Sequence, residues 1–279
     1  MKKVRSRLDL FIIALLSATG CFLRLFQLLR YTDKNTGLVT SNHILSYVIY
    51  GLFAVSLVFS LLYSFNVKKR KNILLSAGNK KVCILLCLLG VAYFCDYIHQ
   101  CINLYGYISD SSYVDFNYAA ILALSGIAAL VSCSYVNIII MLVQGCNFDC
   151  RRLGFFHFVP VIWAFLRMII IMMKIVDFKE DVESFCEFLF LTVFICFSFS
   201  VISAVDRKDK SVSQIFTVFG LMTFFSSFVI ALPRILAVLT GRSFMISDAS
   251  FTPILYLIAG LLSATAVVSV TEKDEIILE

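Results

Sequence analysis

The sequence predicts an all-helical integral membrane protein, and two observations lead to this prediction. Apolar residues make up 60% of the 279-residue chain and charged residues only 15%, whereas a soluble domain carries about a quarter of charged residues. The apolar residues also gather into runs of roughly twenty between short charged loops, which is typical of transmembrane helices. The mean hydropathy of +0.92 agrees with a membrane protein. We therefore expect one transmembrane domain, residues 1–279, without an extramembrane domain.

Hydropathy divides the chain into about eight spans. They lie near residues 9–31, 43–66, 82–105, 117–144, 154–176, 184–205, 212–239 and 252–270. The first span has an alternative, because "MKKVRSR" followed by "FIIALLSATGC" resembles a lipoprotein signal that is cleaved before Cys21. We expect it to be retained as a helix, because Ala18 stands where such signals have Leu and the apolar run continues past Cys21.

Basic residues predict the orientation of the spans. Most of the 24 Lys and Arg residues fall on one side of the membrane if the N-terminus is cytoplasmic. These residues are Lys2, Lys3, Arg5, Arg7, Lys68, Lys69, Arg70, Lys71, Lys80, Lys81, Arg151, Arg152, Arg207, Lys208, Lys210 and Lys273. The opposite loops hold Lys34, Lys179 and Arg242, with several acidic residues besides. Cytoplasmic loops carry the excess of Lys and Arg, so both termini are expected in the cytoplasm.

Two segments suggest a parallel repeat of four helices plus four. "AFLRMIIIMMKIVDF" (164–178) echoes "CFLRLFQLLRYTD" (21–33), each with Phe-Leu-Arg, then a late cation and an Asp. Both would lie in the first helix of a four-helix half with the same orientation, as a parallel repeat requires. A match this short between hydrophobic segments also arises by chance, and both explanations stay open.

The candidate site consists of ionisable residues inside the predicted spans. They are Arg24, Asp96, His99, Arg167, Glu187 and Arg234. A charge within a span costs at least about 2.5 kcal/mol on insertion scales, so such residues normally face the bundle interior and find partners. Arg167 is predicted near mid-membrane and the others in the outer half, whereas the cytoplasmic halves hold almost no ionisable groups.

This layer of charges predicts an outward-facing cationic cavity. With Lys174 included, the cations outnumber Asp96 and Glu187, and the guanidinium fork of Arg24, Arg167 and Arg234 suits carboxylate or phosphate. The alternative is structural: Arg24–Asp96 and Arg234–Glu187 would be interhelical ion pairs, and Arg167 would cap backbone carbonyls. Snorkelling of Arg24 is a further alternative.

Asp96 and His99 are three residues apart and therefore share one helix face with Gln100. Such a pair suits proton relay or the orientation of the arginines, and the alternative is a polar patch that orients its helix. Pro233, which precedes Arg234, removes a helix hydrogen bond and predicts a kink in the seventh span.

No catalytic signature, cofactor motif or standard metal pattern occurs in the sequence. We expect no enzyme activity, cofactor or metal, and no nucleic-acid partner, because the basic residues sit at helix ends rather than in one patch. Most of the 10 cysteines lie within spans, where cysteine is a small apolar filler. Cys101 and Cys186 approach the same boundary, and whether they pair stays open.

"RLFQLLRYTDKNTGL" (24–38) combines an Arg-x-x-Gln-Leu helix end with an Asp-x-x-Thr-Gly turn. This stretch resembles uncharacterised multi-spanning membrane proteins of Gram-positive bacteria. The resemblance covers little more than the first span and loop. It implies a bacterial plasma membrane location and no particular activity.

Three functional hypotheses follow. The first is a small transporter or substrate-binding membrane component for an anionic or zwitterionic small molecule or lipid. The second is a structural or regulatory membrane protein that acts through helix–helix contacts, with membrane lipids as its surroundings. The third is a membrane enzyme on a lipid-linked substrate, which requires a nucleophile that the sequence does not identify.

Overall fold

The computed structural model describes eight helices and a few residues at their ends. The described residues are 2–31, 44–65, 80–110, 115–143, 158–174, 182–206, 210–240 and 252–276. The helices are α1 (Lys2–Tyr31), α2 (Ile44–Ser64), α3 (Lys80–Asp110), α4 (Phe116–Val143), α5 (Val159–Lys174), α6 (Val182–Asp206), α7 (Lys210–Leu239) and α8 (Thr252–Ile276). Within these ranges the chain forms no strand, and the predicted all-helical membrane fold is confirmed.

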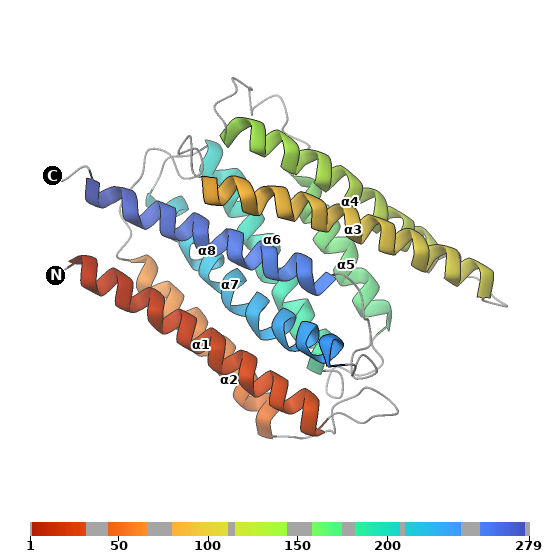
Figure 1. The fold of residues 1–279 in the computed structure, drawn as a ribbon, viewed down its shortest axis with the longest axis horizontal. Helices are drawn as coiled ribbons and strands as arrows, with labels where there is room; N and C mark the ends of the chain where they lie inside the picture. Colours follow the sequence, from red (N-terminus) through yellow and green to blue (C-terminus); the bar gives the residue numbers. More distant parts are fainter. Residues whose placement is uncertain are drawn as a thin grey trace.

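The helices run side by side, and the start of α1 and the end of α8 lie at the same end of the bundle (Figure 1). Helix α7 is central, because it packs against α1, α2, α6 and α8. In the apolar segment of α7, 72% of the residues are buried, compared with 22% in that of α2. The α3/α4 pair lies beside α8 and α5 (Figure 1). A polar group on α7 therefore faces protein rather than lipid.

Seven of the described helices are long and apolar enough to cross a membrane, namely all except α5. Helix α5 is apolar but has 16 residues, or about 24 Å at 1.5 Å per residue, which is less than a hydrocarbon core of about 30 Å. The predicted span 154–176 is thus longer than the helix, and residues 154–157 and 175–176 lie outside the described ranges. The chain is a multi-pass membrane protein.

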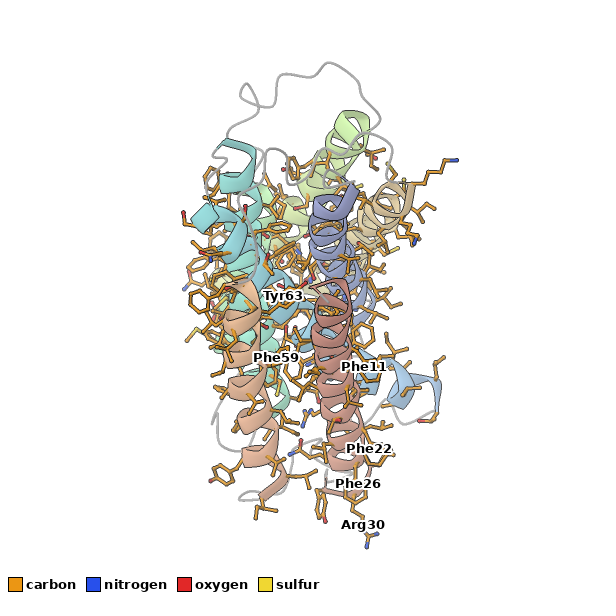
Figure 2. The ribbon with its side chains drawn as sticks, turned by 90° about the vertical axis from the view of Figure 1, so that its left-hand side faces the viewer. Phe11, Phe22, Phe26, Arg30, Phe59 and Tyr63 are labelled. Carbon is orange, nitrogen blue, oxygen red and sulfur yellow. The ribbon has the colours of Figure 1, made fainter. Side chains whose placement is uncertain are left out.

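The outer face of α1 has the composition expected of a surface that contacts lipid. Phe11 and Phe22 are 64% and 66% exposed, and Phe26 lies further along the same face (Figure 2). Arg30 lies at the end of the helix, beyond these phenylalanines (Figure 2). Because lipid tails are as apolar as these side chains, their exposure is compatible with a bilayer and not with water.

Close approach of helices depends on small residues. A Cβ on Gly260 of α8 would lie 1.8 Å from Ser227 Oγ and 2.6 Å from its Cβ, on α7. A Cβ on Gly20 of α1 would lie 2.7 Å from Val229 of α7. Glycine therefore lets the backbones of α1 and α8 lie close to side chains of the central helix, as small residues do in membrane helix packing.

A cluster of aromatic side chains fills the bundle around Trp163 of α5. The indole ring meets Tyr93 of α3 edge-on at 5.2 Å between ring centroids, and Phe194 of α6 at 6.3 Å. The ring centroid of Tyr256 of α8 lies 4.4 Å from that of Phe190 of α6. These residues are buried and hold α3, α5, α6 and α8 in fixed positions.

The packing of the helices agrees only in part with the predicted four-plus-four repeat. The hairpins α3/α4 and α7/α8 correspond, as do α1/α2 and α5/α6. Helix α7, however, packs against four helices, whereas its equivalent α3 packs chiefly against α4 and α8. The duplication stays a prediction.

Candidate functional site

Two carboxylates on α6 form the centre of a buried ion network. Glu183 and Glu187 are one helical turn apart and therefore lie on the same face. Arg234 of α7 reaches both, with 2.8 Å from Nε to Glu183 Oε1 and 2.8 Å from Nη2 to Glu187 Oε2. All three residues are buried. A single guanidinium fork thus joins α6 to the central helix.

Two further arginines extend the network on either side. Arg24 of α1 places Nη2 4.0 Å from Glu183 Oε2, and Arg167 of α5 places Nε 3.6 Å from Glu187 Oε1. Charges therefore alternate along Arg24, Glu183, Arg234, Glu187 and Arg167, which come from four helices. Such alternation offsets the cost of burying each charge, because every carboxylate lies between two cations.

Neutral donors and acceptors complete this network. Tyr256 Oη of α8 donates to Glu187 Oε1 at 2.5 Å, and Arg167 Nη2 donates to Thr252 Oγ1 at 3.2 Å. At the other end Arg24 donates to the side-chain oxygen of Gln27, whose Nε2 donates to Ser46 Oγ of α2 at 2.7 Å. The ion network therefore ties together α1, α2, α5, α6, α7 and α8.

Asp96 and His99 of α3 occupy different surroundings. Asp96 is completely buried and its Oδ2 accepts a hydrogen bond of 2.9 Å from Trp163 Nε1. His99 is half-buried, and its Nδ1 lies 3.1 Å from Asn103 Nδ2. Asp96 and His99 thus have different hydrogen-bond partners, and their role as an acid–base pair stays a prediction.

A cavity of about 250 Å³ lies between α3, α4 and α5. Its lining residues are Gln100, Asn103, Tyr107, Tyr118, Leu122, Arg167 and Ile170. Arg167 is the one charged residue among the described residues of this lining. Gln100 is 1% exposed, and neither its amide nitrogen nor its amide oxygen has a hydrogen-bond partner. A buried amide of this kind is rare, because an unmade hydrogen bond there costs about 1–3 kcal/mol.

Two tyrosines border the cavity near the ends of α3 and α4. The rings of Tyr107 and Tyr118 meet edge-on at 4.9 Å, and Tyr107 Oη accepts a hydrogen bond of 3.1 Å from the backbone N–H of Asp115. Both tyrosines lie at the end of the bundle that the charge distribution predicts to face outward. The cavity is therefore at the predicted outer end.

The structure brings four of the six predicted site residues together and leaves Asp96 and His99 outside this group. Arg24, Arg167, Arg234 and Glu187 meet in the ion network, and Arg167 also lines the cavity. The predicted Arg234–Glu187 pair is confirmed. The predicted Arg24–Asp96 pair is wrong, because Arg24 contacts Glu183 and Gln27 while Asp96 accepts from Trp163.

The predicted excess of positive charge among the intramembrane residues is smaller than expected, because Glu183 is buried as well. With Glu183 included, three buried arginines face three buried carboxylates in the described part of the chain, and the side chain of Lys174 lies outside the description. Among the described residues that line the cavity, Arg167 carries the positive charge.

Three residues of the site were not predicted from the sequence, namely Glu183, Tyr256 and Gln100. Glu183 stands one residue before the predicted sixth span and is therefore outside the predicted set of intramembrane charges. Nothing in the hydropathy pattern distinguishes Tyr256 from other membrane tyrosines. Gln100 carried a signal, because it shares a face with Asp96 at four-residue spacing.

Cys101 and Cys186 form no disulfide bond with each other, and the first is exposed whereas the second is buried. The described residues contain no group of three His, Cys, Asp or Glu side chains positioned for a metal ion.

These features define an all-helical, multi-pass membrane protein with an ion network buried within the membrane-spanning bundle. No family model, curated protein or solved structure matches the chain. Its functional interpretation therefore rests on the geometry.

Proposed function

We propose that this protein is a small transporter or substrate-binding membrane component that takes a small anionic or zwitterionic solute, or a lipid head group, into the Arg167 cavity. The observation that carries the proposal is the lining of the cavity. The Arg167 guanidinium and the buried Gln100 amide, which has no hydrogen-bond partner, face the same space, and no carboxylate is among the described residues that line it.

The chemistry of the lining favours a ligand that carries an anionic group. Arg167 supplies the positive charge, and its contacts with Glu187 and Thr252 fix the direction of the guanidinium plane. The amide of Gln100 offers one acceptor and two donor hydrogens. A carboxylate or phosphate beside Arg167, with a hydrogen-bonding group next to it, would satisfy both residues.

The volume of the cavity limits the size of the ligand. A cavity of 150 Å³ in another protein holds one benzene molecule, and pockets for drug-sized ligands begin near roughly 300 Å³. The cavity here, at about 250 Å³, lies between the two. This size suits a small organic acid, an amino acid or a head group, and not a complete lipid.

The test compares the protein with Gln100→Met and with Asn137→Met, a control that changes an exposed amide on α4. Thermal unfolding of the purified protein in lipid nanodiscs is measured against a panel of small carboxylates, amino acids and phosphate esters. We expect at least one compound to raise the Tm of the unmodified protein and of Asn137→Met, but not that of Gln100→Met.

Without a ligand, Gln100→Met is expected to keep or raise the Tm, because an apolar side chain replaces a buried amide without partners. This result separates loss of binding from loss of fold. If no compound of the panel raises the Tm of the unmodified protein, the cavity is not a binding site for these solutes.

A second candidate is a structural or regulatory role through helix–helix contacts. It is favoured by the equal number of buried cations and carboxylates and by the alternating ion network. In that case Arg234→Gln lowers the Tm, while none of the compounds shifts it for any variant.

A further inference from the structure

A row of polar side chains on α3 continues past the cavity toward the middle of the bundle. Tyr93, Asp96, Gln100, Asn103 and Tyr107 follow each other at steps of three and four residues, so they form one stripe along the helix. The last three line the cavity, while Tyr93 and Asp96 lie deeper, against Trp163 of α5. The polar stripe is therefore longer than the cavity.

Helix α4 presents a matching stripe with the same steps. It consists of Leu122, Ser125, Ala129, Ser132 and Val136, all buried. Its two ends are placed by contacts: Leu122 lines the cavity, and Val136 lies 3.4 Å from a Cβ built on Gly90 of α3. Ser125 and Ser132 therefore face the same interior as the α3 stripe.

The register of the two antiparallel helices, α3 and α4, determines which residues of the two stripes lie at the same height along the helix axes. A Cβ on Gly126 would lie 3.5 Å from Gln100, and one on Gly90 would touch Val136. Ser125 is then level with Gln100, and Ser132 is level with Tyr93. Asp96 falls between the two levels.

Four of these buried side chains have no hydrogen-bond partner: Tyr93 Oη, both amide atoms of Gln100, Ser125 Oγ and Ser132 Oγ. Elsewhere in the described bundle many buried hydroxyls bond to a carbonyl of their own helix, as Ser17 does to Ile13 and Thr217 to Ser213. Ser60 of α2 is another hydroxyl without a partner and lies away from this row. Buried polar groups that have no hydrogen-bond partner within the protein usually bind ordered water.

Distance distinguishes water from a bound cation. Ser125 and Ser132 are seven residues apart, or about 10.5 Å along the helix axis. One cation with oxygen ligands at about 2.5 Å cannot contact both. A file of three or four water molecules at about 2.8 Å spacing covers this length. Water is the occupant that fits the whole row.

The row stops at the level of Tyr93. Along the same stripe of α3 the next residues toward its start are Leu89, Leu86 and Val82, all buried in the apolar core, and Val136 continues the α4 stripe. This apolar layer closes the row at one end.

We propose that the cavity continues as a file of water between α3 and α4, open toward Tyr107 and closed below Tyr93. We name it the polar seam and define it by Tyr93, Asp96, Gln100, Ser125 and Ser132. The seam gives the Asp96 carboxyl contact with water from one side of the membrane only. The proposal concerns water and stands whether or not the cavity takes a solute.

The first test uses the unmodified protein in nanodiscs and hydroxyl-radical footprinting with X-ray-generated radicals. Tyr93 and Tyr256 are both completely buried, but the hydroxyl of Tyr256 is bonded to Glu187. We expect Tyr93 to be oxidised several times faster than Tyr256, because radicals form from water next to it. Equal, slow oxidation of the two tyrosines would show that the seam is dry and would overturn the proposal.

The second test locates the open end. In a variant with the native cysteines replaced by serine, Ser125→Cys, Ser132→Cys and Ser226→Cys are reconstituted in sealed vesicles of known orientation. Silver ions, which are close to water in size, are added to one side, and thiols that remain are counted with maleimide after denaturation. Ser226 of α7 serves as the control, because it is equally buried but its hydroxyl donates to the carbonyl of Met222 on its own helix.

Both thiols on α4 are expected to react at least tenfold faster than the control thiol, from the side of Tyr107 only. Reaction as slow as that of Ser226→Cys contradicts a water file. Reaction from both sides contradicts the closed end.

Discussion

Each carboxylate of α6 lies between two arginines from different helices. Glu183 has Arg24 and Arg234, while Glu187 has Arg234 and Arg167. A buried carboxylate that loses a cation keeps its desolvation cost and loses the attraction that offsets it. Removing the shared arginine is therefore the most damaging single change in this network.

We expect Arg234→Gln to lower the free energy of unfolding by about 3–5 kcal/mol, because two buried carboxylates lose their closest cation. The measurement is denaturant or thermal unfolding in detergent, with Arg30→Gln as control. Arg30 is exposed at the end of α1, and its replacement is expected to change stability by less than about 0.5 kcal/mol. Equal stability of the two variants would contradict the ion network.

Tyr256→Phe removes the hydroxyl that donates to Glu187 and leaves the ring in place. A hydrogen bond to a charged group contributes about 1.5–3 kcal/mol, and a loss of that size is expected in the same unfolding measurement. The control is Tyr47→Phe, since Tyr47 is 64% exposed on α2. A loss no larger than that of the control would show that Glu187 does not depend on this donor.

At the scale of the helices, hydropathy predicted where most elements lie but not which of them touch. Arg24 and Asp96 look like natural partners in the sequence, yet α1 packs on α7 and α2, whereas α3 packs chiefly on α4 and α8. Glu183 was missed because a hydropathy window ends where charges begin, although the carboxylate is buried. Packing order and interhelical distance are not encoded in local composition, so pairing could not be derived from it.

The contact between α7 and α8 gives a prediction at this scale. Gly260→Ala places a methyl group against Ser227 and is expected to cost about 1–3 kcal/mol, as overpacking does. Adding Ser227→Gly removes the atoms in conflict and is expected to recover part of the loss. Gly51→Ala on α2 is the control, because a Cβ there meets nothing within 4 Å. No recovery in the double variant would mean that the loss has another origin.

At the scale of the whole molecule, the class of protein could be predicted from the sequence, but the candidate site could be predicted only in part. Composition and apolar runs were sufficient for a multi-pass helical bundle, because a membrane admits few other folds. The cavity was not predictable, since it depends on three helices meeting around Gln100 and Arg167. Its position at one end agrees with the predicted layer of polar residues.

The orientation of the molecule is open to a direct test. Reporter fusions after residue 276 and within residues 66–79 are expected to be active only in the cytoplasm, and a fusion within 111–114 only outside. The reason is the excess of Lys and Arg in the loop that contains Lys68 to Lys71. The opposite pattern would invert the predicted side of the cavity while leaving its structure unchanged.

The alternation of charge across four helices also bears on how the chain is made. Arg24 leaves the ribosome early, and the glutamate that neutralises it belongs to a helix synthesised much later. Until then the arginine must reach a head group along its own aliphatic stem, which its place near the end of α1 allows. Chains interrupted before α6 would carry an uncompensated cation in lipid, and cellular quality control is expected to recognise and degrade them.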